Sequence, residues 1–393
     1  MGLTIVYPIF TPLILKPIYT LLPHHYSLSV RLILLGLLIA SFPLAQSLAG
    51  PIIGHLADWK GRKFSLTLAL FGQAIGFTLS GLAIVLMNYP FLLLSRIVTG
   101  FFAGNLMLCL SAISDMYETD KERSKKFGTV SSIIGMSFVI AIALGGTLSD
   151  SSLDLFFNSS LPFWAMTLFS LINIAIIRMK FSETHTDKIS QKHYIREGYQ
   201  ELWKICKGKN LKYLYGTFFF FMLGWIVSLQ FLSTFLIEHF KGEKGTITLL
   251  FIGVGLAWCI GSLAVNRYLI RFIKVGQILF YSLFLSMMML FFSSLAHSFL
   301  FFVHCILLGG LLASIAWANC LSLISKKAPS HVRGKLFGVN QSVATISMAF
   351  APFFGGMAGE FDIRTIYLFA STSLLIATLI LIIFNVKNRF IKQ

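Results

Sequence analysis

Long apolar segments follow one another along the whole chain, separated by short polar stretches. Each is close to the length of about 20 residues that an α-helix needs to cross a bilayer. Because the bilayer core offers no partner for backbone polar groups, we expect every span to be a helix. The pattern predicts twelve spans, at residues 3–20, 32–56, 64–87, 90–114, 127–149, 161–180, 213–237, 246–266, 275–296, 299–325, 337–359 and 364–386.

A polar and basic segment at residues 181–212 interrupts this pattern. It divides the chain into a first six-helix bundle at 1–180 and a second at 213–393. Its apolar side chains recur at helical spacing, at Ile195, Tyr199, Leu202 and Cys206. This spacing predicts an amphipathic helix on the membrane surface, which serves either as a tether between the halves or as a regulatory site.

The two halves share one internal pattern, which appears when the chain is shifted by 210 residues. The matches are Gly100 with Gly310, Arg123 with Arg333, Lys125 with Lys335, Phe127 with Phe337, Gly128 with Gly338, Ser132 with Ser342, Ser137 with Ser347, Ala141 with Ala351, and Gly145-Gly146 with Gly355-Gly356. No gap is needed. Duplicated membrane halves are typical of secondary transporters, whose substrate site lies near the midplane between the repeats.

The composition agrees with a membrane protein, since 56% of the residues are hydrophobic and 12% are charged. A soluble chain carries about a quarter charged residues. The net charge of +17 raises the possibility of nucleic-acid binding, but 26 of the 32 Lys and Arg residues fall on one side of the predicted topology. By the positive-inside rule this side, with both termini, is cytoplasmic. We therefore expect a multi-pass protein of the inner membrane, with the lipid bilayer and no nucleic acid as a partner.

A glycine-rich charged loop follows the second span, with Gly54, Asp58, Gly61, Arg62 and Lys63. Gly61 allows a tight turn between antiparallel spans. The loop resembles the signature loop of the major facilitator superfamily, at the family's spacing. This resemblance implies that the loop latches the two halves on the cytoplasmic side. The alternative is an ordinary positive-inside loop without a latch.

The fourth span contains Arg96, and a buried charge there is a functional candidate. Gly100 and Gly104 follow it at the spacing of close helix packing. The stretch resembles the superfamily's fourth-helix motif, whose arginine is linked to proton coupling; a structural or snorkelling arginine is the alternative. His304 is a second proton-coupling candidate, because histidine titrates near neutral pH, although a lone histidine in a span also serves as a structural group.

The next loop, with Asp115, Glu122, Arg123, Phe127 and Gly128, looks like that of the tetracycline-exporter branch of drug:proton antiporters. Such exporters carry a proline before a glycine pair in the fifth helix. Here the pair Gly145-Gly146 lacks that proline, whereas the repeat-related pair Gly355-Gly356 follows Pro352. We expect these residues to pack helices together, and the misplaced proline weakens the case for drug antiport.

No acidic residue lies in the middle of a predicted span, although exporters of cationic drugs often hold a buried carboxylate. The polar and aromatic candidates for a substrate cavity are Gln46, Asn105, Gln230, Trp225, Trp317, Asn319, Asn340 and Gln341. This set suits a neutral or anionic substrate better than a cation. Alternatively, most of these amides bond across helices.

The sequence therefore predicts an all-α membrane protein of twelve helices in two pseudo-symmetric six-helix bundles, with the major facilitator fold. No phosphate-binding loop, metal-ligand spacing or catalytic motif is present, so we expect no enzyme activity, no cofactor and no metal. The resemblance implies proton-linked efflux of a small amphipathic compound by a monomer. The rivals are a transporter of an organic anion, metabolite or siderophore, and a non-transporting membrane sensor.

Overall fold

The computed structural model describes residues 2, 5–15, 21–23, 25–149, 158–184, 211–241, 244–326 and 333–390. The amphipathic helix expected within 181–212 lies almost entirely outside these residues. The first-half helices are α1 (Tyr7–Leu15), α2 (Leu28–Lys60), α3 (Arg62–Val85), α4 (Tyr89–Phe101), α5 (Asn105–Met116), α6 (Asp120–Leu148) and α7 (Leu161–Lys180). The second-half helices are α9 (Leu211–Gln230), α10 (Leu232–Phe240), α11 (Lys244–Ile260), the π-helical turn η1 (Gly261–Val265), α12 (Asn266–Phe272), α13 (Val275–Ser294), α14 (Phe299–Lys326), α15 (Arg333–Phe361) and α16 (Thr365–Phe390).

The chain divides into two units that do not follow the halves of the sequence. Unit 1 contains Met1–Ala112, Ser137–Gly198 and His331–Ser342. Unit 2 contains Ile113–Met136, Tyr199–Ser330 and Val343–Gln393. Each unit therefore includes one short segment from the other half of the sequence. The division into bundles at 1–180 and 213–393 stays a prediction.

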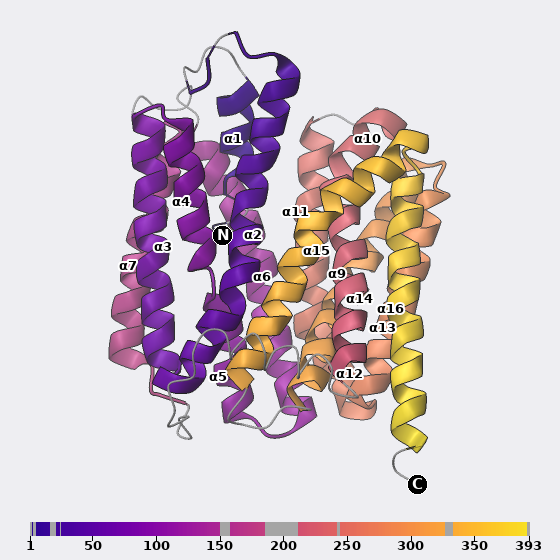
Figure 1. Ribbon diagram of the computed structural model, residues 1–393. Helices are drawn as coiled ribbons and strands as arrows, with labels where there is room; N and C mark the ends of the chain where they lie inside the picture. The colour runs from indigo at the N-terminus through magenta and orange to yellow at the C-terminus, as the bar shows by residue number, and fades with distance from the viewer. Residues whose placement is uncertain are drawn as a thin grey trace. The chain divides into compact units, whose positions relative to one another are not determined.

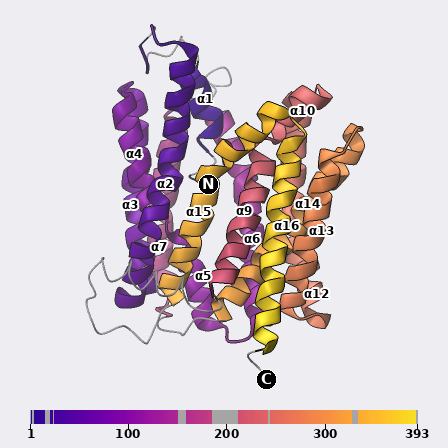
Figure 2. The ribbon, with the colours of Figure 1, turned by 45° about the vertical axis from the view of Figure 1, so that its right-hand side comes forward.

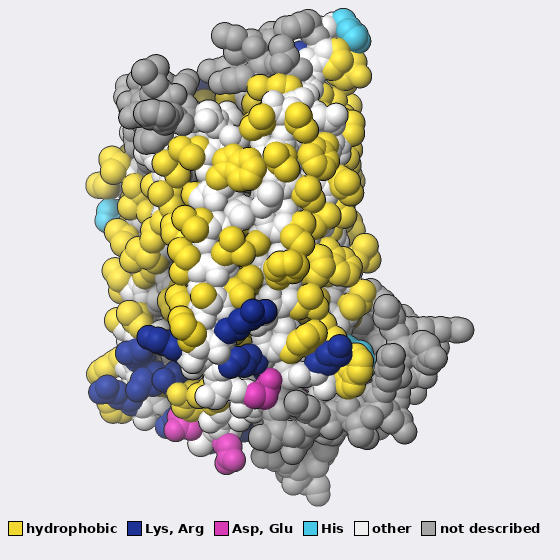
Figure 3. All heavy atoms as spheres, turned by 90° about the vertical axis from the view of Figure 1, so that its left-hand side faces the viewer, with side chains coloured by type: hydrophobic (Ala, Val, Ile, Leu, Met, Phe, Trp, Pro, Cys, Tyr) yellow, Lys and Arg dark blue, Asp and Glu magenta, His cyan; other side chains and the backbone are white. Residues whose placement is uncertain are grey.

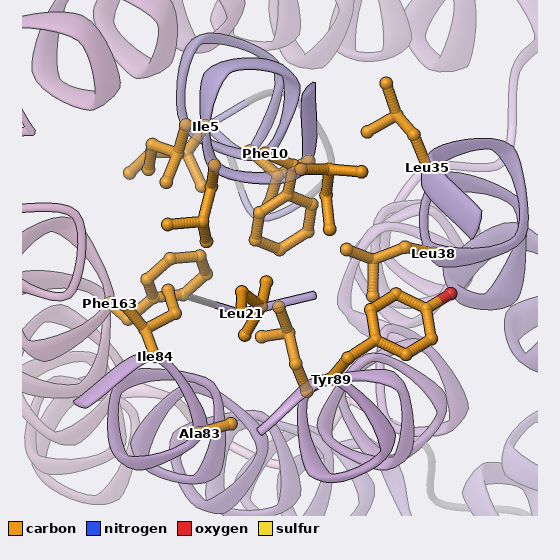
Figure 4. Close-up of a cluster of buried hydrophobic side chains, with 14 of the residues drawn as sticks. Ile5, Phe10, Leu21, Leu35, Leu38, Ala83, Ile84, Tyr89 and Phe163 are labelled. Carbon is orange, nitrogen blue, oxygen red and sulfur yellow. The ribbon is translucent and has the colours of Figure 1, made fainter. Parts of the chain in front are cut away.

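In unit 1, α3 packs against both α4 and α7, and α2 packs against α4 and α1 (Figure 1). A cluster of buried apolar side chains joins these helices, including Phe10, Leu38, Ile84 and Phe163 (Figure 4). The rings of Phe10 and Phe163 stack with centroids 5.8 Å apart. Small residues let α3 and α4 approach, with the Ser80 and Ser95 hydroxyls 2.8 Å apart.

In unit 2, α13 packs against α14 and α16, while α9 packs against α16 and α11 against α14 (Figure 2). Aromatic rings fill the interior near α10. Phe235 stacks on Phe302 with centroids 4.8 Å apart, and Tyr367 meets both rings edge-on. These residues are completely buried, so the phenylalanine-rich second half builds a core of interlocking rings as well as a lipid-facing surface.

Eleven helical segments of the described chain are long and apolar enough to cross a membrane. The twelfth expected span, residues 3–20, contains the nine-residue α1, and the described range does not extend through the residues that follow it. Apolar side chains cover most of the face in Figure 3, and Lys and Arg gather toward its lower end. The chain is thus a multi-pass, all-helical membrane protein in the residues described.

Several predicted boundaries need correction. The fourth span is not continuous, because α4 and α5 are separated by non-helical residues 102–104. The span expected to begin at 127 begins at Asp120, where the Thr119 hydroxyl accepts the Glu122 backbone N–H (3.2 Å) and donates to the Glu122 carboxylate (2.8 Å). This Thr-x-x-Glu cap is a helix-start signal that is visible in the sequence. The prediction began the span later because the first turns of α6 are polar. The span expected to end at 266 continues through η1 and α12 to Phe272.

Candidate functional site

The charged loop predicted after the second span forms a sharp break between α2 and α3. Gly61 has φ +100° and ψ 164°, a backbone conformation that favours glycine. Asp58 lies before the break and Arg62 after it, and the Arg62 Nη1 donates to Asp58 Oδ1 at 2.7 Å. Both side chains are completely buried. A buried ion pair of this kind holds its local geometry firmly, because separating it leaves an uncompensated charge.

Glu183, beyond the end of α7, adds a contact to this break that the sequence prediction missed. Its carboxylate accepts the backbone N–H of Arg62 at 2.8 Å and of Lys63 at 3.2 Å. These are among the unpaired donors at the start of α3, where a negative charge is favoured. A Cβ at Gly61 would overlap the Glu183 carboxylate, which is a second reason for glycine there. The sequence signal that could have indicated this cap is the position of Glu183, an acidic residue just after an apolar span.

In unit 1, α2 and the first turns of α15 meet by close backbone contact. A Cβ added at Gly338 would lie 2.5 Å from the Gly50 carbonyl oxygen, and one added at Gly50 would lie 2.7 Å from the Gly338 carbonyl oxygen. One turn further on, the Ser342 hydroxyl donates to the Ser47 carbonyl at 2.6 Å. Neither glycine position has room for a side chain, so the contact depends on both.

In unit 2, α6 meets the junction of α11 and η1 in the same way. A Cβ added at Gly128 would lie 2.5 Å from the Ser262 carbonyl oxygen. The Ser132 hydroxyl lies 2.8 Å from the Ser262 hydroxyl and 3.3 Å from the Cys259 carbonyl. The π-helical turn places an extra residue in this helix, as often happens at functional sites.

The internal repeat relates these two contacts. Gly128 and Ser132 are the 210-residue mates of Gly338 and Ser342. Their partners, Ser262 and Cys259, stand 212 residues after Gly50 and Ser47. We call the two sets the paired Gly–Ser contacts. Each one joins a helix of the first sequence half to a helix of the second, inside a single unit.

A closed ring of hydrogen bonds lies beside the unit 2 contact. The Ser124 hydroxyl donates to Asn319 Oδ1 (2.8 Å), Asn319 Nδ2 donates to Asn266 Oδ1 (2.7 Å), and Asn266 Nδ2 donates to the Ser124 hydroxyl (3.2 Å). All three side chains are completely buried. The polar triangle therefore ties α6 to α12 and α14, and it places the cavity candidate Asn319 in a helix-joining network.

Further contacts join the α5–α6 turn to the end of α14. The Arg123 guanidinium donates to the Ser325 hydroxyl at 3.0 Å, and Ser114 and Ser325 share a short hydrogen bond. The Ser322 hydroxyl donates to the Asp120 carbonyl at 2.7 Å, and Lys326 pairs with the Asp120 carboxylate at 2.5 Å. The Lys326 side chain is 56% exposed, so this ion pair adds at most about 1 kcal/mol.

The break between α4 and α5 gathers three amides within unit 1. The Gln46 Nε2 donates to the Ala103 carbonyl at 2.5 Å, and the Asn105 Nδ2 donates to Gln73 Oε1 at 3.0 Å. All three amide side chains are half-buried. The buried Asn105 Oδ1 has no hydrogen-bond partner among the described residues. Interrupted helices of this kind line substrate sites in transporters, because their backbone groups are open to a ligand.

Arg96 lies on α4 before this break and is completely buried. Its guanidinium lies 4.6 Å from the centroid of the Phe42 ring and 5.6 Å from that of Phe10. The Nη1 group donates to the Gly2 carbonyl at 3.3 Å. An arginine does not release its proton in proteins, so any coupling role is to influence another group rather than to carry the proton.

The other predicted candidates lie in varied settings. His304 is exposed, and its Nδ1 contacts the carbonyl of Leu300 in its own helix at 2.7 Å. Trp225 is buried, and its ring lies 5.5 Å from that of Trp258, whose N–H donates to the Ser131 hydroxyl at 2.7 Å. Trp317 and Asn340 are buried, Gln341 is half-buried and Gln230 is exposed. The Asn340 Oδ1 lacks a described hydrogen-bond partner.

The predicted packing glycines fall into two groups. Gly100 on α4 lies against the Phe42 backbone of α2, Gly104 against Ile53, and Gly355 against the Phe231 ring. Apart from the adjacent residues and backbone of its own helix, a Cβ at Gly146 or Gly356 would meet no described atom within 4 Å. The structure therefore gives those two repeat-related glycines no packing contact with another helix. Pro352 lies inside α15, one turn before Gly356.

Comparisons with known proteins agree with this architecture. The model of the Major Facilitator Superfamily matches residues 1–352 and 214–391. Multidrug resistance protein 1 of Bacillus subtilis is 23% identical over 354 residues, which cover 87% of this chain and 84% of that protein. The class H tetracycline resistance protein of Pasteurella multocida is 30% identical over 149 residues, 38% of this chain and 35% of that one.

Solved structures show the same fold. The human organic anion transporter MFSD10 matches with a TM-score of 0.78 at 18% identity, over 96% of each chain. The transporter FucP in the outward conformation matches with a TM-score of 0.75 at 15% identity, over 98% of this chain and 97% of that one. Together with the family match along the chain, this fold shows that the protein is a membrane transporter, not an enzyme, and belongs to the Major Facilitator Superfamily.

Proposed function

We propose that the chain exports a small amphipathic compound across the cytoplasmic membrane, by alternating access driven by the proton gradient. The similarity to a multidrug resistance protein over 87% of the chain supports the direction and the substrate class. The paired Gly–Ser contacts carry the alternating-access part of the proposal. They join helices of opposite sequence halves, and the repeat makes them equivalent.

The chemistry of these contacts suits a gate that opens and closes. The hydrogen bonds of the paired Gly–Ser contacts and of the polar triangle are all between neutral groups. Hydrogen bonds between membrane helices contribute about 0.6 kcal/mol each on average. The buried Asp58–Arg62 pair is different, because both residues belong to the first half and stay together when the gate opens. The buried ion pair thus lies within one half, whereas the neutral hydrogen bonds of the paired Gly–Ser contacts and the polar triangle cross between halves.

The substrate site in this proposal is the α4–α5 break, with Gln46, Gln73 and Asn105. Amides supply neutral donors and acceptors, and the unpaired Asn105 Oδ1 offers an acceptor to a ligand. Among the described residues, the charge in the body of a span is the cation Arg96, while the carboxylates lie at or near helix ends. Such a site favours neutral or weakly charged amphipathic compounds.

Transport by the purified protein in proteoliposomes with an imposed pH gradient tests this proposal. We expect a neutral amphipathic dye to move against its gradient and an uncoupler to abolish that movement. Asn105→Ala should weaken dye binding about tenfold, whereas Asn173→Ala, at an exposed amide on α7, should leave it unchanged. An unchanged rate of dye transport in the presence of the uncoupler contradicts the proton coupling.

Transport of an organic anion is the second candidate, and the buried Arg96 favours it. The same proteoliposomes, loaded with a small carboxylate, distinguish the two candidates. If the wild type transports the carboxylate but not the dye, and Arg96→Gln abolishes carboxylate transport, the anion is the substrate.

A further inference from the structure

A basic pocket lies in unit 2 between the start of α6 and the end of α12. Its volume is about 270 Å³, and its lining residues are Lys121, Glu122, Lys125, Arg267, Ile270 and Arg271. Pockets for drug-sized ligands begin at about 300 Å³, so this one suits a smaller group. It lies outside the α4–α5 break and the paired Gly–Ser contacts.

The positive charge of this basic pocket is not neutralised by the protein residues that the structure describes. Four cationic side chains face one carboxylate, and that carboxylate, Glu122, accepts the Thr119 hydroxyl at 2.8 Å. None of the four cations has an ion-pair partner in the described chain. Arg267 donates from Nη2 to the Thr129 hydroxyl at 3.0 Å, but its buried Nε has no hydrogen-bond partner there. These side chains present several hydrogen-bond donors and a net positive charge, which suit an anion with several acceptor oxygens.

Aromatic residues beside the basic pocket indicate its depth in the membrane. Tyr268 and Phe272 lie on the same helix as Arg267 and Arg271, with their rings 5.2 Å apart. They are 62% and 73% exposed, and α12 ends the span Leu249–Phe272. Aromatic side chains exposed at the end of a span lie at the level of the lipid headgroups. The pocket therefore opens where phospholipid phosphates are concentrated.

We propose that this pocket binds the phosphate of an anionic phospholipid headgroup. The planar guanidinium groups of Arg267 and Arg271 match the geometry of phosphate oxygens, and Lys121 and Lys125 add charge from the other wall. Basic pockets between membrane helices on the cytoplasmic side are typical sites for anionic headgroups. The apolar Ile270 accommodates the glycerol carbons.

A bound headgroup would brace one of the proposed gate contacts. Lys125 lies next to Ser124, and Arg267 lies next to Asn266, so the basic pocket borders the polar triangle directly. Its two walls, α6 and α12, come from opposite sequence halves. An anion held by both walls stabilises their contact, and the anionic lipid content of the membrane thereby regulates how readily the contact opens.

Thermal unfolding of the full-length protein tests lipid binding without any transport substrate, so its outcome does not depend on the proposed function. The probes are nanodiscs of phosphatidylcholine alone and of phosphatidylcholine with one quarter phosphatidylglycerol, and, in detergent, inorganic phosphate. We expect phosphatidylglycerol to raise the midpoint of unfolding by several degrees, with a smaller rise at high salt because screening weakens the contact. Inorganic phosphate at millimolar concentration should have no effect.

The double variant Arg267→Gln/Arg271→Gln should lose this shift, and binding of phosphatidylglycerol measured by native mass spectrometry should fall at least tenfold. Lys121→Gln/Lys125→Gln removes the two exposed lysines of the pocket and should also lose the shift. This variant provides the test if the arginine double variant does not fold. Lys274→Gln and Arg178→Gln remove exposed cations outside the pocket and should retain the full shift. An equal shift in the lysine double variant and the wild type contradicts the proposal. An equal response to inorganic phosphate identifies a free-anion site instead.

Discussion

At the scale of single residues, the Asp58–Arg62 ion pair fixes the turn between α2 and α3. Both side chains are completely buried, and their 2.7 Å contact closes over the sharp turn at Gly61. Glu183 caps the start of α3 by accepting the Arg62 backbone N–H. The turn thus has an internal ion pair and an external cap, and each can be removed separately.

Asp58→Asn should disturb this turn strongly. The substitution leaves the Arg62 charge buried opposite a neutral amide, which costs about 3 kcal/mol or more. We expect a large loss of transport at equal amounts of protein in the membrane, measured by dye efflux and immunodetection. Glu238→Gln, at an exposed carboxylate on α10, is the matched control and should keep full transport. Full activity in Asp58→Asn would remove this pair from the mechanism.

Asn319→Leu tests the polar triangle, because leucine keeps the branching of the side chain and removes both hydrogen-bonding groups. Asn266 and Ser124 then lose their shared partner, at a cost of about 0.6–1.7 kcal/mol for each bond between helices. The expected result is a lower midpoint of thermal unfolding. In contrast, Asn173→Leu changes an exposed asparagine that bonds only within α7 and should leave the midpoint unchanged. Identical midpoints for Asn319→Leu and the wild type would show that the triangle adds no stability.

At the scale of helices, the paired Gly–Ser contacts depend on the absence of side chains. A Cβ added at Gly128 or at Gly338 would lie 2.5 Å from a carbonyl oxygen of the facing helix. A real Cβ does not tolerate that distance, so either helix must move. Both helices, α6 and α15, also pass from one unit to the other.

Gly128→Ala and Gly338→Ala should each reduce transport about tenfold, which corresponds to about 1.4 kcal/mol of lost stabilisation. Gly146→Ala and Gly356→Ala provide controls on the same two helices, since an added Cβ meets no described atom of another helix within 4 Å. The measurement is the initial rate of dye efflux for all four variants. If the controls lose as much activity as the contact variants, helix distortion rather than the contact is responsible.

At the scale of the whole molecule, the distribution of charge predicts the orientation in the membrane. Lys274 is exposed directly after α12, at the end of unit 2 that also carries the end of α16 (Figures 1 and 2). We expect Lys274→Cys, in a cysteine-free background, to react with a membrane-impermeant maleimide only after the cell is permeabilised. Arg364→Cys, in the opposite turn before α16, should react in intact cells. The reverse labelling pattern would invert the proposed topology.

Much of this architecture was predictable because hydropathy depends on composition over about 20 residues. The Asp58–Arg62 turn was also predictable, since Gly61 and its neighbours form a local motif. The α4–α5 break was not predicted, because residues 102–104 are as apolar as their neighbours and hydropathy does not detect a change of backbone conformation inside an apolar segment. Gly104, a poor helix former, was the available signal. The role of Asn319 was likewise hidden, because its partners Ser124 and Asn266 lie 195 and 53 residues away.

The paired Gly–Ser contacts also bear on how the two halves diverged after their duplication. Glycine and serine are identical between the halves on α6 and α15, whereas the facing residues differ, with Gly50 against Ser262 and Ser47 against Cys259. On the facing helices, Ser47 and Cys259 contribute their backbone carbonyl oxygens, which every amino acid supplies. The side chain at this position could therefore change between the duplicates, whereas Gly50 stays confined by its contact with Gly338.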